Sequence, residues 1–164
     1  MHSGQRQYLE ERYRASEWHG REAAGRQIIT GFDFSGSELS GWVLYRKRRE
    51  ERGDPPAIRS LWQRSDPATE LLAVDVWECA SIVAAHDQVL EVLANVQSDA
   101  VERHDGIGDI AFRLGHTMEL FARVNVVVLL RNAGSKIVDI DPVARAIDEL
   151  LVGLSGPRRP SRRR

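Results

Sequence analysis

Cysteine is nearly absent from this chain of 164 residues, which contains only Cys79. One thiol excludes a disulfide within the chain and any zinc site built from several thiolates. Long apolar runs are missing too, because the longest one, residues 126–130, is far shorter than the roughly 20 residues of a membrane-spanning helix. The first residues lack the apolar core of a secretory signal. We therefore expect a cytoplasmic protein, or an envelope or secreted one if a signal segment precedes this sequence.

The composition is that of an ordinary globular protein, with 42% hydrophobic and 29% charged residues. A chain of this length builds one domain without help from disulfides or metals. Its charge is uneven, because five of the last nine residues are arginines. Without those five, 18 basic residues face 24 acidic ones, a net charge of about −6. The sequence thus predicts an acidic body and a basic tail.

Charge patterning divides the chain into three parts. Residues 1–26 are dense in charge, and acid-before-base pairs four residues apart predict a helical arm. Residues 27–155 carry the apolar patterns of a single folded domain. Residues 156–164, GPRRPSRRR, lack apolar side chains to bury and predict a disordered, arginine-rich tail.

Apolar periodicity predicts an α+β fold. Alternation of apolar and polar residues indicates strands at 42–49, 58–64, 70–79, 101–104, 110–114 and 118–131, and a short returning strand at 136–140. Apolar steps of three and four predict a helix over 81–96 capped by Ser81, and another that begins with Asp141 as its cap. Short turns favour a mostly antiparallel sheet packed by helices, a helix–sheet sandwich of βββ-α-βββ-α order after the N-terminal helix. The stretch 118–131 reads as one long central strand.

Polar residues gather around the turn at 104–119. Imidazole and carboxylate groups can bind a divalent ion, so they form a candidate metal site, although polar loop residues are more often simply solvated. The candidates are His104, Asp105, Asp109, His116 and Glu119. No cofactor is expected, because the glycines in 106–109 lack the lysine and following helix of a phosphate loop and read better as a tight turn.

Cys79 and His86 have the chemistry of a nucleophile and its base. Such a pair also needs an orienting third group within hydrogen-bond reach, and the sequence shows none. Burial of both residues in the core is therefore the preferred interpretation.

Three tryptophans and one aspartate are candidates for a ligand groove or an interface. Trp42, Trp62 and Trp77 fall on neighbouring predicted strands and would line a groove if they shared one face, although core packing is the commoner outcome. Asp75 interrupts an apolar strand. It must be paired if it faces inward, and an edge position facing solvent explains it more simply.

A second group of candidates is basic. The run Arg46, Lys47, Arg48 and Arg49, together with the tail, could contact phosphates or an acidic partner. The acidic body disfavours nucleic acid, so the arginines alone keep that alternative open.

Two stretches resemble small bacterial domains of the PsbP-like and secreted-lipoprotein type. One is GFDF…ELSGW (31–42). The other is GIGDIAF (106–112), followed by LFARVNVVVLL (120–130) and DPVARAIDELL (141–151). The resemblance implies a helix–sheet–helix sandwich that acts as a binding, accessory or sensor module without catalytic residues. The chain departs from that pattern in having no lipobox cysteine.

The leading hypothesis is a non-enzymatic binding, interaction or sensor-like domain for a protein or small-molecule ligand. We expect it to dimerise through an aromatic sheet face or through the N-terminal helix. The first alternative is a small-molecule or metal-dependent enzyme that uses the cluster at 104–119. The second is an adaptor for nucleic acid or acidic proteins that uses the arginines.

Overall fold

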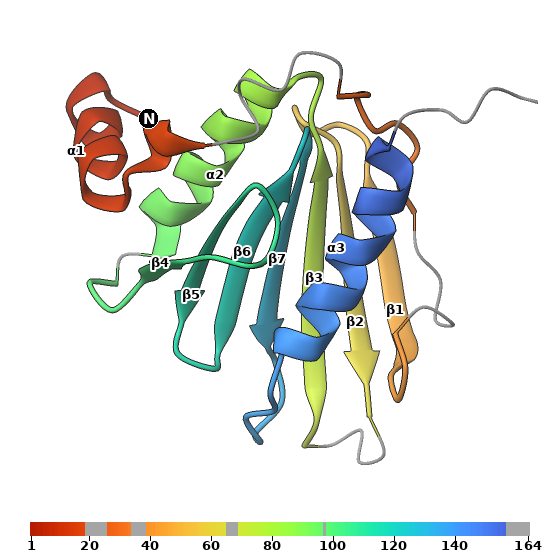
Figure 1. Cartoon of the computed structure of the whole chain (residues 1–164). Helices are drawn as coiled ribbons and strands as arrows, with labels where there is room; N and C mark the ends of the chain where they lie inside the picture. The colour runs from red at the N-terminus through yellow and green to blue at the C-terminus, as the bar shows by residue number, and fades with distance from the viewer. Residues whose placement is uncertain (19–25, 34–38, 65–68, 97, 157–164) are drawn as a thin grey trace, which may run out of the picture.

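The computed structural model describes residues 1–18, 26–33, 39–64, 69–96 and 98–156. One seven-stranded antiparallel sheet forms its centre, in the order β1-β2-β3-β7-β6-β5-β4 (Figure 1). The strands are β1 (Val43–Glu50), β2 (Ala57–Gln63), β3 (Leu71–Glu78), β4 (Glu102–His104), β5 (Ile110–Leu114), β6 (Met118–Arg123) and β7 (Val126–Asn132). The helices are α1 (Ser3–Tyr13), a 3₁₀ turn (Ala15–Glu17), α2 (Ile82–Val96) and α3 (Asp141–Ser155). The α+β class and the helix–sheet arrangement are confirmed.

The sheet consists of two antiparallel meanders that meet at its centre. Strands β1 to β3 form the first meander, and β4 to β7 form the second. Helix α2 connects them, and β3 then pairs with β7 over seven residues, from Leu72 opposite Asn132 to Glu78 opposite Val126. In the described residues no helix is long and apolar enough to cross a bilayer.

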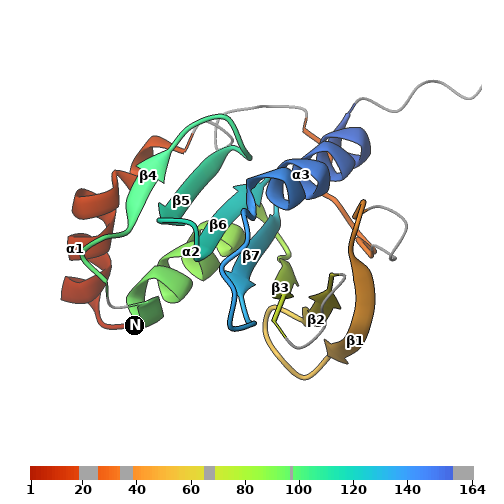
Figure 2. The same ribbon diagram turned by 90° about the horizontal axis from the view of Figure 1, so that it is seen from below.

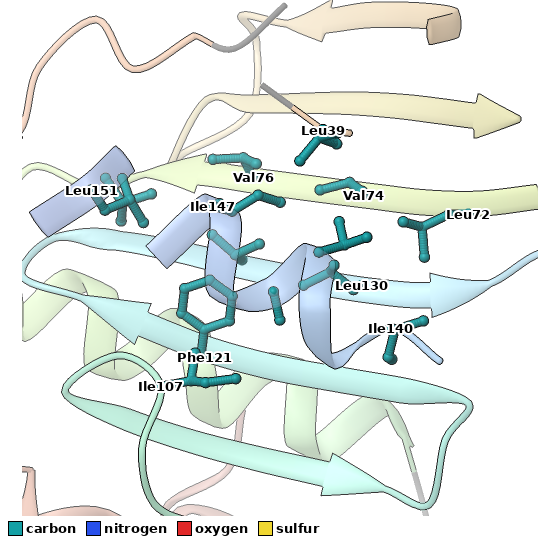
Figure 3. Close-up of a cluster of buried hydrophobic side chains, with 14 of the residues drawn as sticks. Leu39, Leu72, Val74, Val76, Ile107, Phe121, Leu130, Ile140, Ile147 and Leu151 are labelled. Atoms are coloured by element: carbon teal, nitrogen blue, oxygen red, sulfur yellow. The ribbon is translucent and has the colours of Figure 1, made fainter. Parts of the chain in front are cut away.

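Side chains alternate across the strands and therefore build two cores, one on each face of the sheet. Helices α2 and α3 lie on opposite sides of it (Figure 2). We call the two the α3-side core and the α2-side core. The α3-side core includes Leu72, Val74, Val76, Phe121, Leu130, Ile147 and Leu151 (Figure 3). The α2-side core includes Leu90, Leu93, Phe112, Leu120 and Val127.

The described part of the N-terminal arm belongs to the α2-side core. Leu9, Tyr13 and Trp18 are buried there, and the Tyr13 ring packs edge-on against Phe112 at a centroid distance of 5.6 Å. The predicted helix is shorter than expected, because α1 ends at Tyr13 and Arg14 adopts a left-handed conformation with φ of 49°. Residues 19–25 and the predicted tail, 157–164, lie outside the described residues.

The prediction of one long strand over 118–131 is wrong. The chain reverses at Val124 and Asn125, so β6 and β7 form a hairpin. Val124 has φ of 55°, a conformation that β-branched residues seldom adopt. The Asp109 carboxylate accepts a hydrogen bond from the Val124 N–H at 2.7 Å, and the Asn125 side chain bonds to Ile29 and Cys79. These tertiary contacts hold a turn that the apolar pattern conceals.

Two predictions near the last helix are also wrong. Residues 136–140 form no strand, and the Asn132 side chain instead bonds to the backbone of Val138. Asp141 is the first residue of α3 rather than its cap, and its carboxylate contacts Arg113 and Arg145. At α2, by contrast, the Ser81 hydroxyl accepts a hydrogen bond from the Ala84 N–H at 3.1 Å, which confirms the predicted cap.

Candidate functional site

The α2 side of the sheet is only partly covered by helices. Helix α2 packs against β6, β7 and the near side of β3. Beyond it, a groove with a volume of about 670 Å³ runs between α2, the β1–β2 hairpin and the floor made by β2, β3 and β7. Its long wall is one stripe of α2, formed by Gln88, Glu91, Val92 and Asn95. This groove is the candidate site.

An ion pair between a buried carboxylate and an exposed arginine lies on the floor of the groove. Arg131 on β7 donates to Asp75 Oδ2 on β3 at 2.7 Å, and Asp75 is only 5% exposed. Burial raises the pKa of Asp75 above its ordinary value, and the charge of Arg131 opposes that rise. The preferred interpretation of Asp75, an edge position facing solvent, is therefore wrong, since β3 lies inside the sheet and the carboxylate is buried.

The wall of the groove contains an amide that has no hydrogen-bond partner among the described residues. Gln88 is 8% exposed and lines the groove, and its side chain makes no hydrogen bond to any described residue. Its amide atoms are not among the unpartnered side-chain atoms that are closed off from solvent, so they are available to a ligand in the groove. Gln88 was not among the residues predicted from the sequence. Its spacing from Glu91 and Asn95 gives a polar stripe beside the apolar one, which a helical projection would reveal.

Acidic side chains outnumber basic ones along the groove. The lining contains four carboxylates, Glu50, Asp54, Asp75 and Glu91, against the guanidinium groups of Arg59 and Arg131. Arg59 is already 3.1 Å from Glu50, and Arg131 contacts Asp75. Among the described residues, Asp54 and Glu91 have no ion-pair partner. The groove is therefore electronegative.

The three tryptophans do not share one face, so that interpretation is wrong. Trp77 lines the groove and is partly buried. Trp42 and Trp62 belong to the α3-side core, where Trp62 is fully buried and its Nε1 donates to Ser60 Oγ at 2.9 Å. Only Trp77 is in a position to contact a ligand in the groove.

The basic run lies along β1, an edge strand of the sheet. Cross-strand neighbours point to the same face, so Arg46 and Arg48 lie on the α2 side with Leu61 and Arg59. Lys47 and Arg49 point to the other face, where Lys47 contacts Asp33. None of the four lines the groove, and alternation keeps them from forming one continuous cationic face.

The predicted metal candidates separate into three places. His104 Nε2 lies 2.8 Å from Glu119 Oε1, and Arg113 contacts the other oxygen of this buried carboxylate. Asp109 instead bonds to Arg123, while Asp105 and His116 are exposed in turns. Within the described ranges no three His, Cys, Asp or Glu side chains are placed to hold a metal ion. Metal binding stays a prediction, supported only by the His104–Glu119 contact.

The remaining candidates of the sequence analysis serve the core. Cys79 is 2% exposed, and burial raises the pKa of its thiol to about 12, which disfavours the nucleophilic thiolate. His86 is fully buried, 3.2 Å from Glu10 of α1. In the turn at 106–109, Gly108 N–H donates to Asp148 and Asp109 N–H to the Ala122 carbonyl, so these donors are not free for a phosphate.

The raised pKa of Asp75 leads to a pH-dependent prediction for the variant Asp75→Asn. Because folding raises the pKa of Asp75, its ionised form destabilises the folded state of the unmodified protein. The contribution of Asp75 to the free energy of unfolding is therefore largest below the ordinary pKa of 3.8 and is lost as the pH rises through the folded-state pKa. We expect the free energy of unfolding of Asp75→Asn to increase relative to the unmodified protein between pH 4 and pH 7. Urea denaturation at several pH values measures this difference, and a difference that stays constant would contradict the assignment.

Comparison with protein-family models, curated proteins and solved structures finds no match. The resemblance to PsbP-like and lipoprotein-type domains therefore stays a prediction. The function has to be argued from the groove itself.

Proposed function

We propose that this domain is a non-enzymatic protein-binding module that holds an extended segment of a partner in the groove beside α2. The observation that carries the proposal is Gln88, a largely buried side chain that lines the groove and whose amide bonds to no described residue. A ligand that shields this amide from water has to pair with it, because leaving a polar group buried and unpaired costs about 1–3 kcal/mol.

The length of the groove suits a short peptide. The groove follows the second half of α2, residues 88–96, which span about 12 Å at 1.5 Å per residue. An extended chain rises about 3.3 Å per residue, so about four residues fit beside this part of the helix.

The chemistry of the groove suits a polypeptide as well. The Gln88 amide can both donate to a backbone carbonyl and accept from a backbone N–H. Asp75 uses Oδ2 for Arg131, and no described residue donates to its Oδ1, which is left to accept from a ligand. Trp77, Val92 and Leu129 add apolar surface for side chains of the segment. A few fixed polar groups among apolar ones are typical of binding sites.

The test is selection from a phage-displayed library of random heptapeptides on the immobilised full chain. We expect enriched peptides to bind the unmodified protein and to lose at least tenfold in affinity for Gln88→Leu and for Trp77→Leu. Val152→Ala, on the exposed side of α3, serves as the matched control and should bind as before. Circular dichroism confirms that each variant is folded.

Two results would contradict the proposal. One is the absence of any enrichment over an empty surface. The other is a set of enriched peptides that bind both groove variants as tightly as they bind the control.

The other functional hypotheses remain open as alternatives. An enzyme at the 104–119 turn would have to use the His104–Glu119 contact. Neither residue lines the groove, although Arg103 and Asp105 beside His104 line a second cavity of about 680 Å³. Homodimerisation, recognition of nucleic acid and a cytoplasmic or envelope location stay predictions.

A further inference from the structure

The negative charge of the groove indicates which kind of segment the groove binds. Resting on the proposed function, we infer that the groove binds arginine-rich extended segments, and that its occupant is the basic tail, residues 157–164, of a second copy of this chain.

Electrostatics favours a cationic segment. Asp54 on the hairpin and Glu91 on α2 line opposite walls of the groove, and neither has an ion-pair partner in the described part of the chain. The two arginines of the lining are each compensated by a carboxylate at 3.1 Å or less. The body as a whole carries about −6, so its longer-range field also attracts cations.

The other groups of the groove match a guanidinium ion. Asp75 Oδ1 and the Gln88 carbonyl oxygen are acceptors, and a guanidinium offers five N–H donors in one plane. Trp77 provides an aromatic face, on which guanidinium groups stack better than ammonium groups do. An arginine that enters the groove can therefore use an acid, an amide and an aromatic ring together.

The chain carries a segment of this chemistry. Residues 157–164, PRRPSRRR, contain five arginines and two prolines. Proline favours the extended polyproline conformation, which rises about 3.1 Å per residue, so eight residues span about 25 Å. Such a segment suits an extended binding mode, and its charge of +5 nearly balances the charge of the body.

The tail begins on the face of the sheet away from the groove of its own chain. It follows Gly156 at the end of α3, on the face of the sheet opposite the groove (Figure 2). Packed layers lie about 10 Å apart, so the path from α3 past the sheet to the α2 layer is about 20 Å and uses about six residues. The tail of a second copy can approach the groove directly, without this detour around the sheet.

The test uses the nonapeptide GPRRPSRRR, labelled with fluorescein, and the full chain in which all five tail arginines are glutamine (R158Q, R159Q, R162Q, R163Q, R164Q). We expect the peptide to bind this protein and to lose at least tenfold in affinity when Asp54→Asn and Glu91→Gln are added. The matched control adds Glu102→Gln and Glu149→Gln instead, two exposed carboxylates outside the groove that change the net charge equally. The control should retain the affinity, and a peptide with citrulline in place of arginine should not bind.

Self-association provides the second measurement. Sedimentation velocity of the unmodified chain should show association that increases with protein concentration, weakens at least tenfold between 50 and 500 mM NaCl, and disappears in the five-glutamine variant. A monomeric unmodified chain, a peptide that fails to bind, or equal weakening by both pairs of substitutions would overturn the inference. If library-selected heptapeptides bind the groove while the nonapeptide does not, this inference fails and the proposed function stands.

Discussion

Gly134→Ala is expected to lower the free energy of unfolding by about 3 kcal/mol, the upper end of the usual cost of overpacking. Gly134 lies where the chain after β7 passes directly over the start of β3. A Cβ at this position would collide with the Thr69 carbonyl oxygen and would lie 2.7 Å from the Leu71 backbone nitrogen. Both atoms belong to the backbone, so no side-chain rotation relieves the clash.

The same close approach carries three backbone hydrogen bonds. Ala133 and Gly134 donate to the Leu71 carbonyl, and Lys136 donates to the Thr69 carbonyl at 3.0 Å. Moving the 133–136 turn away to make room for a methyl group breaks these bonds as well. Urea denaturation followed by circular dichroism measures the loss.

Gly153→Ala is the matched control for this prediction. Gly153 lies inside α3, and nothing comes within 4 Å of the position its Cβ would take. Alanine in the interior of a helix stabilises by about 0.5–1 kcal/mol relative to glycine, so this variant should be at least as stable as the unmodified chain. Equal destabilisation by both substitutions would refute the role assigned to Gly134.

Asn125→Ala should cost about 4 kcal/mol, because it leaves three buried backbone groups unpaired at about 1–3 kcal/mol each. The Asn125 side chain is fully buried. Its amide nitrogen donates to the carbonyls of Ile29 and Cys79 at 2.9 and 2.7 Å, and its oxygen accepts from the Ile29 N–H at 2.8 Å. One residue thus joins the β6–β7 turn to the segment before β1 and to the end of β3.

Asn95→Ala provides the comparison for Asn125. Asn95 is exposed on α2, and substitutions at such sites usually change stability by no more than about 0.5 kcal/mol. Hydrogen exchange gives a local measurement, because the Ile29 amide should lose protection in Asn125→Ala and retain it in Asn95→Ala. Unchanged protection at Ile29 would contradict the bonding described.

The sequence was sufficient where structure is local. Alternation of apolar and polar residues predicted β1, β2 and β3 to within about two residues, and a serine before an apolar stripe located the start of α2. The sequence was insufficient where tertiary contacts determine the path of the chain. Alternation continues unbroken across Val124 and Asn125. It could not reveal that the hydrogen bonds of these two residues with Asp109, Ile29 and Cys79 hold a reversal of the chain there.

The candidate site could be predicted only in part for a similar reason. Asp75 and Trp77 attracted attention as a charged and an aromatic residue in an apolar strand. Their environment depends on the pairing of β3 with β7 and on the position of α2, which bring Arg131 and Gln88 beside them from far along the chain. Trp62 does not share a face with Trp77. It pairs with Leu72, so it points to the same face as the even-numbered residues of β3, whereas Trp77 points to the other face.

The position of α1 and α3 on opposite faces of the sheet determines how the molecule responds to stretching. A force applied between Ser3 and Ser155 pulls on two helices and on no strand directly. It therefore loads the contacts between helices and sheet first, which are mainly side-chain packing, before it reaches the backbone hydrogen bonds between strands. Under tension α1 and α3 would therefore separate from the sheet before its strands separate from one another.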